Sequence, residues 1–299
     1  MDGLAKASIL DINGLTVPSA VATPAVAYSV RLLGSGVGIS SYAGACMRVR
    51  RDTDNVEADV GFDSNNEFGL TSPVSNPSSG GPFTDFADFI GHGGGSPANG
   101  FVRWWYDQSG NSRDVGQATQ VTQPKIYDSS TGIVDDGISS IPAIYWNGSN
   151  NLLSSTYTLI PQPITAFASV TFVQGSTSWI YNMQGDAGFA ALSDSGARYE
   201  YWFSGPVIRT GMTNATGQNL PILLGDGANS TMWNNGSSGV QGGDAGSAGS
   251  DQIKLGGSPG VNNYVGYMNE FIMYPNDQES EGTRTTVQDN INAYFSIYP

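Results

Sequence analysis

The amino-acid sequence predicts a mostly β protein, built as an antiparallel sandwich of short strands. The first observation is composition: the chain of 299 residues has 40 glycines, and only 13% of its residues are charged. Its polarity therefore comes from neutral turn-forming residues rather than from the charged pairs that solvate helices. The second is that, from residue 140 onward, short apolar runs alternate with Gly, Asn, Asp and Pro. The third is that no long helical pattern separates these runs.

The N-terminal part is predicted to contain an arm, a domain start and a short helix. Residues 1–26 are expected to form the arm, because the stretch TVPSAVATPAV is small, contains prolines and lacks a clear period. Residues 27–299 are expected to form one sandwich domain, since neither a boundary nor an internal repeat is visible. A short helix is predicted within TDFADFIG, where Thr84 can cap it and Phe86 and Phe89 share one face.

A strand that runs into a turn is predicted in GFVRWWYDQSGN. Strict alternation places Val102, Trp104 and Tyr106 on one apolar face, which we assign to the core. The same alternation leaves Trp105 exposed beside Arg103. The polar residues that follow are typical of a turn, so we interpret the segment as a strand end and not as an aromatic platform for sugars.

Further strands are predicted in the second half of the chain. In ITAFASVTFV, residues 164–173, every second residue from Ile164 is apolar, and the Asn-Gly step in WNNGSS favours a tight hairpin. In ARYEYWFSG, alternation separates Trp202 from its aromatic neighbours. Trp105, Trp202 and Trp233 are therefore the candidate glycan-binding or partner-binding residues. Packing in the core or against another subunit is the alternative for each.

The last element is predicted to be an amphipathic helix that packs back on the sandwich. In NDQESEGTRTTVQDNINAYFSIY, apolar residues recur at helical spacing. They are Val287, Ile291, Tyr294 and Phe295. Acidic residues at 277, 279 and 281 precede them, at the end of a helix where negative charge is favourable.

Charge and residue counts exclude several classes of function. The net charge is −14, and Lys and Arg together number 12, so nucleic acid and anionic membranes are not expected partners. With one cysteine and one histidine, the chain can form neither an intrachain disulfide nor a Cys/His zinc site. The acidic loop sequences DSNNE and GDGANS lack the spacing of an EF-hand. No metal and no cofactor are therefore expected.

Two segments resemble a known fold family. Residues 27–134, with YDQSGN as the most specific string, resemble the N-terminal part of the arabinofuranosidase B type catalytic domain, a concanavalin A-like sandwich, and a similar block in bacteriophage structural proteins. Residues 266–298 resemble the closing strand and helix of concanavalin A-like, laminin-G-like domains, particularly those of phage virion proteins. The resemblance implies an antiparallel jelly roll with a short internal helix and a C-terminal helix.

The resemblance does not supply catalytic residues. A glycosidase needs two carboxylates at a set separation, and Glu200 and Glu270 are the acidic residues favoured to project from regular strands. A solvated or hydrogen-bonded structural role is the alternative for both. The resembling enzymes carry adjacent cysteines near the sugar site, whereas this chain has only Cys46. No catalytic residue is assigned, and the chain is not expected to be an enzyme.

The function implied by the resemblance is that of a bacteriophage virion structural protein: a capsid decoration or cement protein, or a fibre or tail-associated component. The implied partners are major capsid or tail proteins, further copies of the chain, with a trimer as the first hypothesis, and a host surface glycan. An arabinofuranosidase-like hydrolase and a non-catalytic glycan-binding module are the alternatives. The first residues lack the pattern of a signal peptide. We therefore expect synthesis in a host bacterial cytoplasm and no membrane insertion.

Overall fold

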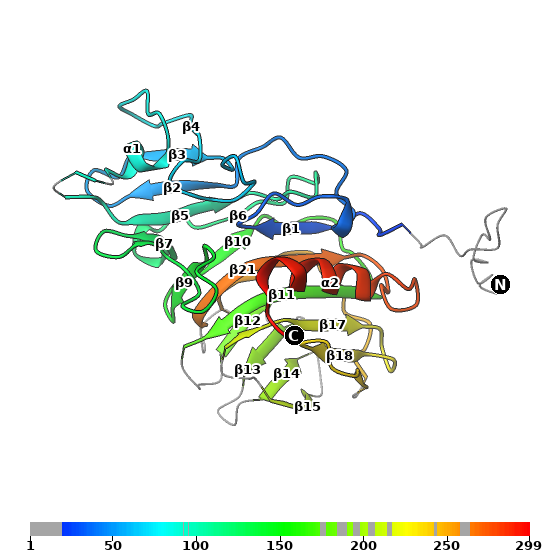
Figure 1. The fold of residues 1–299 in the computed structure, drawn as a ribbon. Coiled ribbons are helices and arrows are strands. Elements are labelled where there is room, and N and C mark those ends of the chain that lie inside the picture. Colours follow the sequence, from blue (N-terminus) through cyan, green and yellow to red (C-terminus); the bar gives the residue numbers. More distant parts are fainter. Residues whose placement is uncertain are drawn as a thin grey trace.

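Short apolar runs bounded by Gly, Asn and Pro form the strands of an antiparallel sandwich. A computed structural model of the chain describes residues 20–299 apart from 92, 95, 174–177, 184–189, 194–197, 203–206, 214–216, 242–243 and 258–263. For the strand residues 178, 190–193, 198–202 and 207–213 the backbone alone is described. The predicted mostly β sandwich is confirmed (Figure 1).

Backbone hydrogen bonds join the described strands into one continuous antiparallel sheet, which folds into two layers. The first layer contains, in spatial order, β4 (Val74–Ser75), β3 (Glu57–Val60), β2 (Met47–Arg51), β5 (Gly100–Trp105), β6 (Val115–Gly116), β10 (Leu152–Ser154), β20 (Lys254–Leu255), β12 (Ser178–Asn182), β13 (Ala190–Ser193), β14 (Arg198–Trp202) and β15 (Val207–Thr213).

The second layer is centred on the two longest strands. It contains, in spatial order, β8 (Gly132–Ile133), β7 (Lys125–Asp128), β9 (Ile144–Asn147), β21 (Val265–Tyr274), β11 (Ile164–Phe172), β16 (Gln218–Asn219) with β17 (Pro221–Gly225), β18 (Thr231–Asn234) and β19 (Val240–Gln241). The strand β1 (Val26–Ser29) pairs with β21, and β5 joins the layers by also pairing with β7. The structure describes two short 3-10 helices as well, η1 (Ser35–Val37) and η2 (Gln120–Thr122).

Aromatic side chains fill the space between the layers. The ring centroids of Tyr181 on β12 and Phe271 on β21 are 4.7 Å apart, and those of Tyr28 and Trp105 are 5.9 Å apart. All four side chains are essentially inaccessible to solvent. The interior therefore depends on contacts between residues far apart in the sequence, as in other sandwiches.

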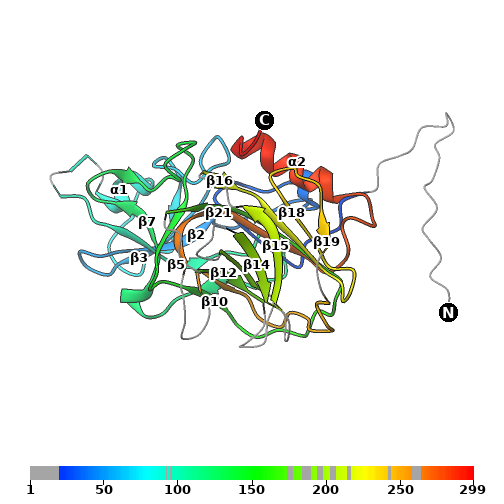
Figure 2. The ribbon, with the colours of Figure 1, turned by 90° about the horizontal axis from the view of Figure 1, so that it is seen from below.

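The C-terminal helix α2 (Arg284–Phe295) lies against the outer face of the second layer, outside the strands (Figures 1 and 2). The predicted apolar stripe is confirmed, because Val287, Ile291 and Phe295 are buried. The helix begins later than predicted, and its first turn carries no acidic residue. Gly282, with φ +70°, separates the acidic turn at 277–281 from the helix, because a chain in this left-handed conformation cannot continue as a right-handed helix.

The short internal helix is α1 (Phe86–Ile90), and its cap differs from the predicted one. The side chain of Asp85, and not that of Thr84, accepts a hydrogen bond from the amide of Asp88. The Asp88 carboxylate in turn accepts one from the amide of Thr84, at 2.9 Å. The two carboxylates thus satisfy two amides at the start of α1, in the manner of a capping box.

The Asn-Gly hairpin forms as predicted, and the last residues of the predicted N-terminal arm are buried. The hairpin between β18 and β19 contains Asn235 and Gly236 with φ of 49° and 72°, as the Asn-Gly step predicts. Of the expected N-terminal arm, residues 1–19 lie outside the described residues, while Ala25 and Val26 are already buried. Among the described residues, neither helix combines the length and the apolar character that a bilayer span requires.

A buried ion pair connects β1, β21 and α2. The Glu270 carboxylate accepts hydrogen bonds from Arg31 at 2.8 and 3.0 Å and from Ser29 at 2.6 Å. Arg31 also donates to Asn290 of α2 at 2.9 Å, and its guanidinium lies over the Tyr294 ring. Burial alone would lower the pKa of Arg31, but Glu270 overcomes this effect and raises it.

This geometry predicts a large stability loss when one partner is removed. Glu270→Met should lower the free energy of unfolding by about 3–5 kcal/mol, because a buried guanidinium loses its carboxylate. The double variant Arg31→Met/Glu270→Met should lose less than Glu270→Met alone. Urea unfolding checks both. As a control, Glu279→Met removes a half-exposed carboxylate from its pair with Arg284 and should cost less than about 1 kcal/mol. Equal losses at the two glutamates would contradict the assignment.

Candidate functional site

A β-bulge in β5 determines which aromatic side chains reach the surface. Val49 of β2 pairs with Val102, but the adjacent Arg48 pairs with Trp104, so that Arg103 is an extra residue in β5. An extra residue exchanges the two faces of a strand beyond it. Trp104 is consequently part-exposed and Trp105 is 0% exposed.

The prediction for this strand is therefore wrong beyond the bulge. Trp105, proposed as an exposed binding residue, is buried, and its Nε1 donates to the Ser29 carbonyl at 3.3 Å. Trp104 and Tyr106, assigned to the core, are part-exposed. Alternation fails here because the strand does not keep one residue opposite each residue of β2.

Glycine on the neighbouring strand gives Trp104 its position. A Cβ added at Gly116 of β6 would come within 2.2 Å of the Trp104 ring, so the indole lies directly against the backbone of that strand. The Arg103 guanidinium lies 4.8 Å from the centroid of the same ring. The indole thus contacts both the backbone of β6 and a cation, and these contacts restrict its orientation at the surface.

Trp104 lines a surface pocket of about 510 Å³, which we call the Trp104 pocket. Its other walls are the segment 111–114, which leads into β6, and the segment 155–158, which follows β10. The lining offers several hydroxyl groups, one guanidinium and one carboxylate beside the two aromatic rings of Trp104 and Tyr157. This volume lies within the range of small-molecule sites.

Arg113 and Tyr157 form one wall of the Trp104 pocket. The Arg113 guanidinium lies 4.3 Å from the centroid of the Tyr157 ring and donates to the Ala25 carbonyl at 3.0 Å. Tyr157 shares a hydrogen bond of 2.6 Å with Ser250, and burial raises its pKa to about 12. Tyr157 is therefore a neutral aromatic residue of the pocket wall, positioned by Arg113 at its ring and by Ser250 at its hydroxyl.

Asp114 supplies the carboxylate of the Trp104 pocket. Its Oδ1 accepts a hydrogen bond from the Asp107 amide at 2.8 Å, and among the described residues no cation forms an ion pair with it. Burial raises the pKa of Asp114, the Asp107 amide lowers it, and repulsion by the Asp107 carboxylate raises it; the result lies above the ordinary value. A carboxylate without a cation is an available acceptor for ligand hydroxyls.

The Asp107 carboxylate holds the segment that carries Asp114. It is buried and accepts hydrogen bonds from the amides of Ala27, Ser109 and Arg113, at 2.9 to 3.0 Å, and from the Ser109 hydroxyl at 2.8 Å. The YDQSGN string thus ties the loop after β5 to β1. Its role in this structure is to position the pocket wall.

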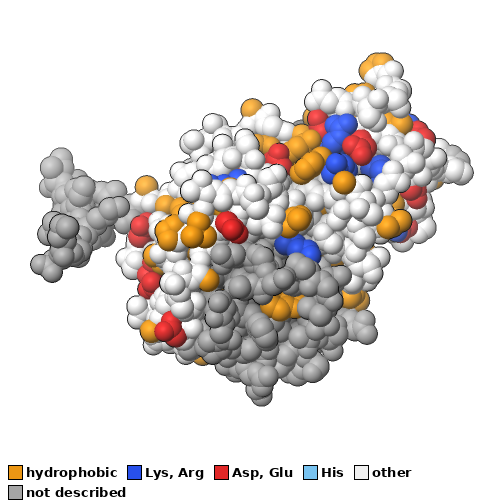
Figure 3. Space-filling view, turned by 180° about the vertical axis from the view of Figure 1, so that it is seen from behind, with side chains coloured by type: hydrophobic (Ala, Val, Ile, Leu, Met, Phe, Trp, Pro, Cys, Tyr) orange, Lys and Arg blue, Asp and Glu red, His pale blue; other side chains and the backbone are white. Residues whose placement is uncertain are grey.

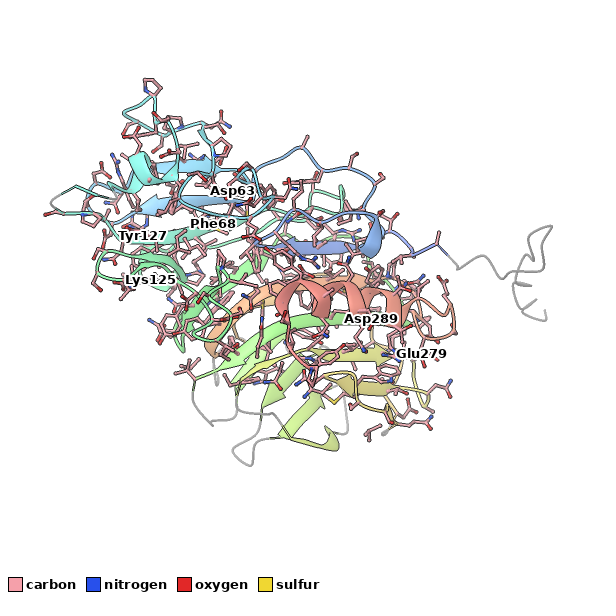
Figure 4. All side chains as sticks on the ribbon, in the orientation of Figure 1. Asp63, Phe68, Lys125, Tyr127, Glu279 and Asp289 are labelled. Carbon is pink, nitrogen blue, oxygen red and sulfur yellow. The ribbon has the colours of Figure 1, made fainter. Side chains whose placement is uncertain are left out.

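A second pocket, of about 370 Å³, lies where β3 and β4 meet the segment before β2; we call it the Tyr42 pocket. Its lining is less polar, with Tyr42 and Phe62 in an edge-on arrangement 6.4 Å apart. Asp63 and Ser75 add polar groups. Figure 4 labels Asp63 in the loop that follows β3, and places Lys125 and Tyr127 on β7 at the other end of the molecule from Glu279 and Asp289.

The remaining candidates from the sequence do not join these pockets. Trp233 is 4% exposed, because the Arg284 guanidinium of α2 covers its ring at 4.6 Å; this burial favours core packing, the alternative left open for this residue, over ligand binding. The Glu270 carboxylate is occupied by its buried ion pair with Arg31. The side chains of Trp202 and Glu200 lie outside the described residues.

Metal and thiol chemistry find no site in the described part of the chain. No three His, Cys, Asp or Glu side chains gather there in a way that could hold a metal ion. Cys46 is fully buried, burial raises its pKa, and its Sγ lies 3.3 Å from the Ser29 carbonyl. It packs as a small apolar residue.

Comparison with solved structures supports the fold. The chain is similar to a GH54 α-L-arabinofuranosidase soaked with a cyclic sulfate inhibitor (TM-score 0.61) and to a mutant soaked with 4-nitrophenyl α-L-arabinofuranoside (TM-score 0.62). It is also similar to an arabinofuranosidase complexed with arabinofuranosyl-α-1,2-xylobiose (TM-score 0.51). In all three the identity is 15%, and the match covers 91% of this chain.

These likenesses establish a shared sandwich fold and no more. The chain spans 63% of the length of each of these arabinofuranosidases. No protein-family model and no curated protein matches the chain. The sequence resemblance to arabinofuranosidases is thus confirmed at the level of fold.

The raised pKa of the partly buried Asp114 carboxyl predicts an unusual pH dependence of stability. Because its pKa is raised by folding, ionisation destabilises the folded chain as the pH rises above about 4, the ordinary value for Asp. The stability that Asp114→Asn gains over the wild type should therefore be larger at pH 7 than at pH 3. Urea unfolding at both pH values measures this.

Asp128 provides the control of opposite sign. A hydrogen bond from Lys125 at 2.8 Å holds the pKa of Asp128 well below its usual range. Its stabilisation is present above pH 4 and is lost as the pH falls. Asp128→Asn should thus lower stability at pH 7, by an amount that shrinks towards pH 3. If both variants respond to pH in the same direction, the assignment of Asp114 is wrong.

Proposed function

We propose that this protein is a glycan-binding β-sandwich that recognises a saccharide in the Trp104 pocket. The observation that carries the proposal is the bulge in β5, which turns Trp104 outward into the pocket that Asp114 also lines, a carboxylate without an ion pair among the described residues. Saccharides present apolar C–H faces together with hydroxyl groups, and aromatic rings beside a few polar groups suit such ligands. The hydroxyls of segment 155–158 add further hydrogen-bonding groups.

The arrangement of carboxylates supports recognition rather than hydrolysis. A glycosidase uses two carboxylates that can both reach the sugar, about 5 Å apart or further. Asp114 is the carboxylate among the described residues that lines the Trp104 pocket. Asp107 lies behind it with its oxygens occupied by backbone and hydroxyl donors. The likeness to arabinofuranosidases makes arabinofuranosyl ligands the first probes.

We place this binding function on a bacteriophage virion, as a decoration, fibre or tail-associated component. The support is the sequence resemblance of residues 27–134 and 266–298. Major capsid or tail proteins and further copies of the chain are the partners in this proposal, and a host surface glycan is the ligand. Phage particles purified on a density gradient should contain the chain, detected by peptide mass spectrometry. Its presence only among unassembled proteins would contradict this setting.

Loss of the indole should weaken saccharide binding. Trp104→Ala should reduce affinity for arabinofuranosyl-α-1,2-xylobiose, or for the ligands found on a glycan array, about tenfold or more, as expected for truncating a central aromatic contact. Trp202→Ala, tested in parallel, evaluates the remaining aromatic candidate from the sequence. If only Trp202→Ala weakens binding, the saccharide site does not lie in the Trp104 pocket.

A hydrolysis assay accompanies the binding assay. We expect no release of nitrophenol from 4-nitrophenyl α-L-arabinofuranoside. Release that is abolished by Asp114→Asn or Glu200→Gln would replace the binding proposal with a hydrolase.

A further inference from the structure

The two pockets open on one face of the first layer. Ser75 of β4 pairs with Asp59 of β3, Asp59 pairs with Arg48 of β2, and Arg48 pairs with Trp104 of β5. Residues paired across neighbouring strands point to the same face of a sheet. Ser75 lines the Tyr42 pocket and Trp104 lines the Trp104 pocket. Three strand spacings, about 14 Å, separate these residues.

A polar strip connects the pockets. The Tyr106 hydroxyl donates to Asp59 at 2.6 Å, and Asn76 donates to the other oxygen of the same carboxylate at 2.7 Å. Arg48 donates to Asp59 at 2.8 Å and to Glu57 at 2.9 Å. Figure 3 shows cationic and acidic side chains together over the end built by β2, β3 and β5. The strip is held by its own hydrogen bonds and is therefore ordered before any ligand arrives.

The pockets are also close through the backbone. Tyr106, which stands two residues beyond Trp104, donates its amide to the Cys46 carbonyl at 3.2 Å. The preceding residue, Ala45, lines the Tyr42 pocket and accepts a hydrogen bond from the Tyr42 hydroxyl at 2.8 Å. The wall of the Tyr42 pocket thus lies one strand away from Tyr106, so a single extended molecule can contact both pockets.

The two pockets differ in character. The Trp104 pocket combines an indole and a phenol with a carboxylate, a guanidinium and several hydroxyls. The Tyr42 pocket is bounded by Tyr42, Phe62, Leu32 and Pro73, with Asp63 among its few polar groups. The first suits a sugar unit with many hydroxyl contacts, and the second suits the apolar face of another unit.

We infer that the two pockets are subsites of one binding track, and that the saccharide bound is an oligosaccharide that spans the strip from Trp104 to Tyr42, not a single sugar. This inference rests on the proposed glycan-binding function. A ligand that occupies both subsites gains affinity over one that fills either alone, because the second contact is made within the same complex.

Chain-length dependence tests the inference. Arabino-, xylo- and gluco-oligosaccharides, from monosaccharide to octasaccharide, are immobilised and probed with the full chain by biolayer interferometry. Affinity should rise about tenfold or more once the oligosaccharide spans both pockets, and then level off. Ala43→Trp, which fills the Tyr42 pocket from its exposed rim, should abolish the rise while it preserves binding of the short ligands.

A matched control separates filling of the Tyr42 pocket from other effects of an added tryptophan, and each contrary outcome identifies which proposal fails. Ser41→Trp places the same side chain at an exposed neighbouring position that lines neither pocket, and it should leave the length dependence unchanged. Binding that depends on Trp104 but not on length, or a rise that survives Ala43→Trp, overturns the track and leaves the proposed function intact. Absence of binding to every oligosaccharide of the series overturns both.

Discussion

Both the sandwich and its pocket depend on the hydrogen bonds that the buried Asp107 carboxylate accepts. It is the acceptor for the amide of Ala27 on β1 and for the amide of Arg113 on the pocket wall. Gln108 extends the same contact, since its Oε1 accepts from the Leu33 amide and its Nε2 donates to the carbonyls of Ser29 and Arg31. These side chains satisfy the edge of β1 that faces away from β21, where a further strand would otherwise be required.

The other edge of β1 is connected to the C-terminal helix through Arg31. There β1 pairs with β21, and Arg31 reaches from the end of β1 to both Glu270 and Asn290. A buried charge is stable only when it is fully paired, so this geometry fixes α2 relative to the sheet. Glu270 looked like a candidate acid in the sequence because it occurs in an apolar strand. The structure shows that its oxygens are already used.

The sequence reveals those features that depend on local chemistry. The strands bounded by glycine, the Asn235–Gly236 hairpin and the apolar stripe of α2 each follow from residues close together in the chain. The exposure of tryptophans does not, because it depends on residues elsewhere: Trp104 faces outward because β2 lacks a residue opposite Arg103, and Trp233 is covered by Arg284. The Trp104 pocket joins segments 111–114 and 155–158, whose proximity only the pairing of β6 with β10 establishes. The adjacent tryptophans of β5 were the one available signal, since a regular strand buries only one of two neighbours.

Three local departures from the most stable arrangement coincide at the Trp104 pocket. A bulge interrupts β5, an indole is part-exposed against a glycine, and Asp114 is partly buried without an ion pair to any cation of the described residues. Elsewhere, carboxylates such as Asp54 and Asp128 are paired with a nearby Arg or Lys, which lowers their pKa. Folds tend to retain such departures where a ligand compensates for them, since each lowers the stability of the free protein. Their concentration at one place, on a wall that Asp107 also holds in position, is the physical reason for proposing that this pocket binds a ligand.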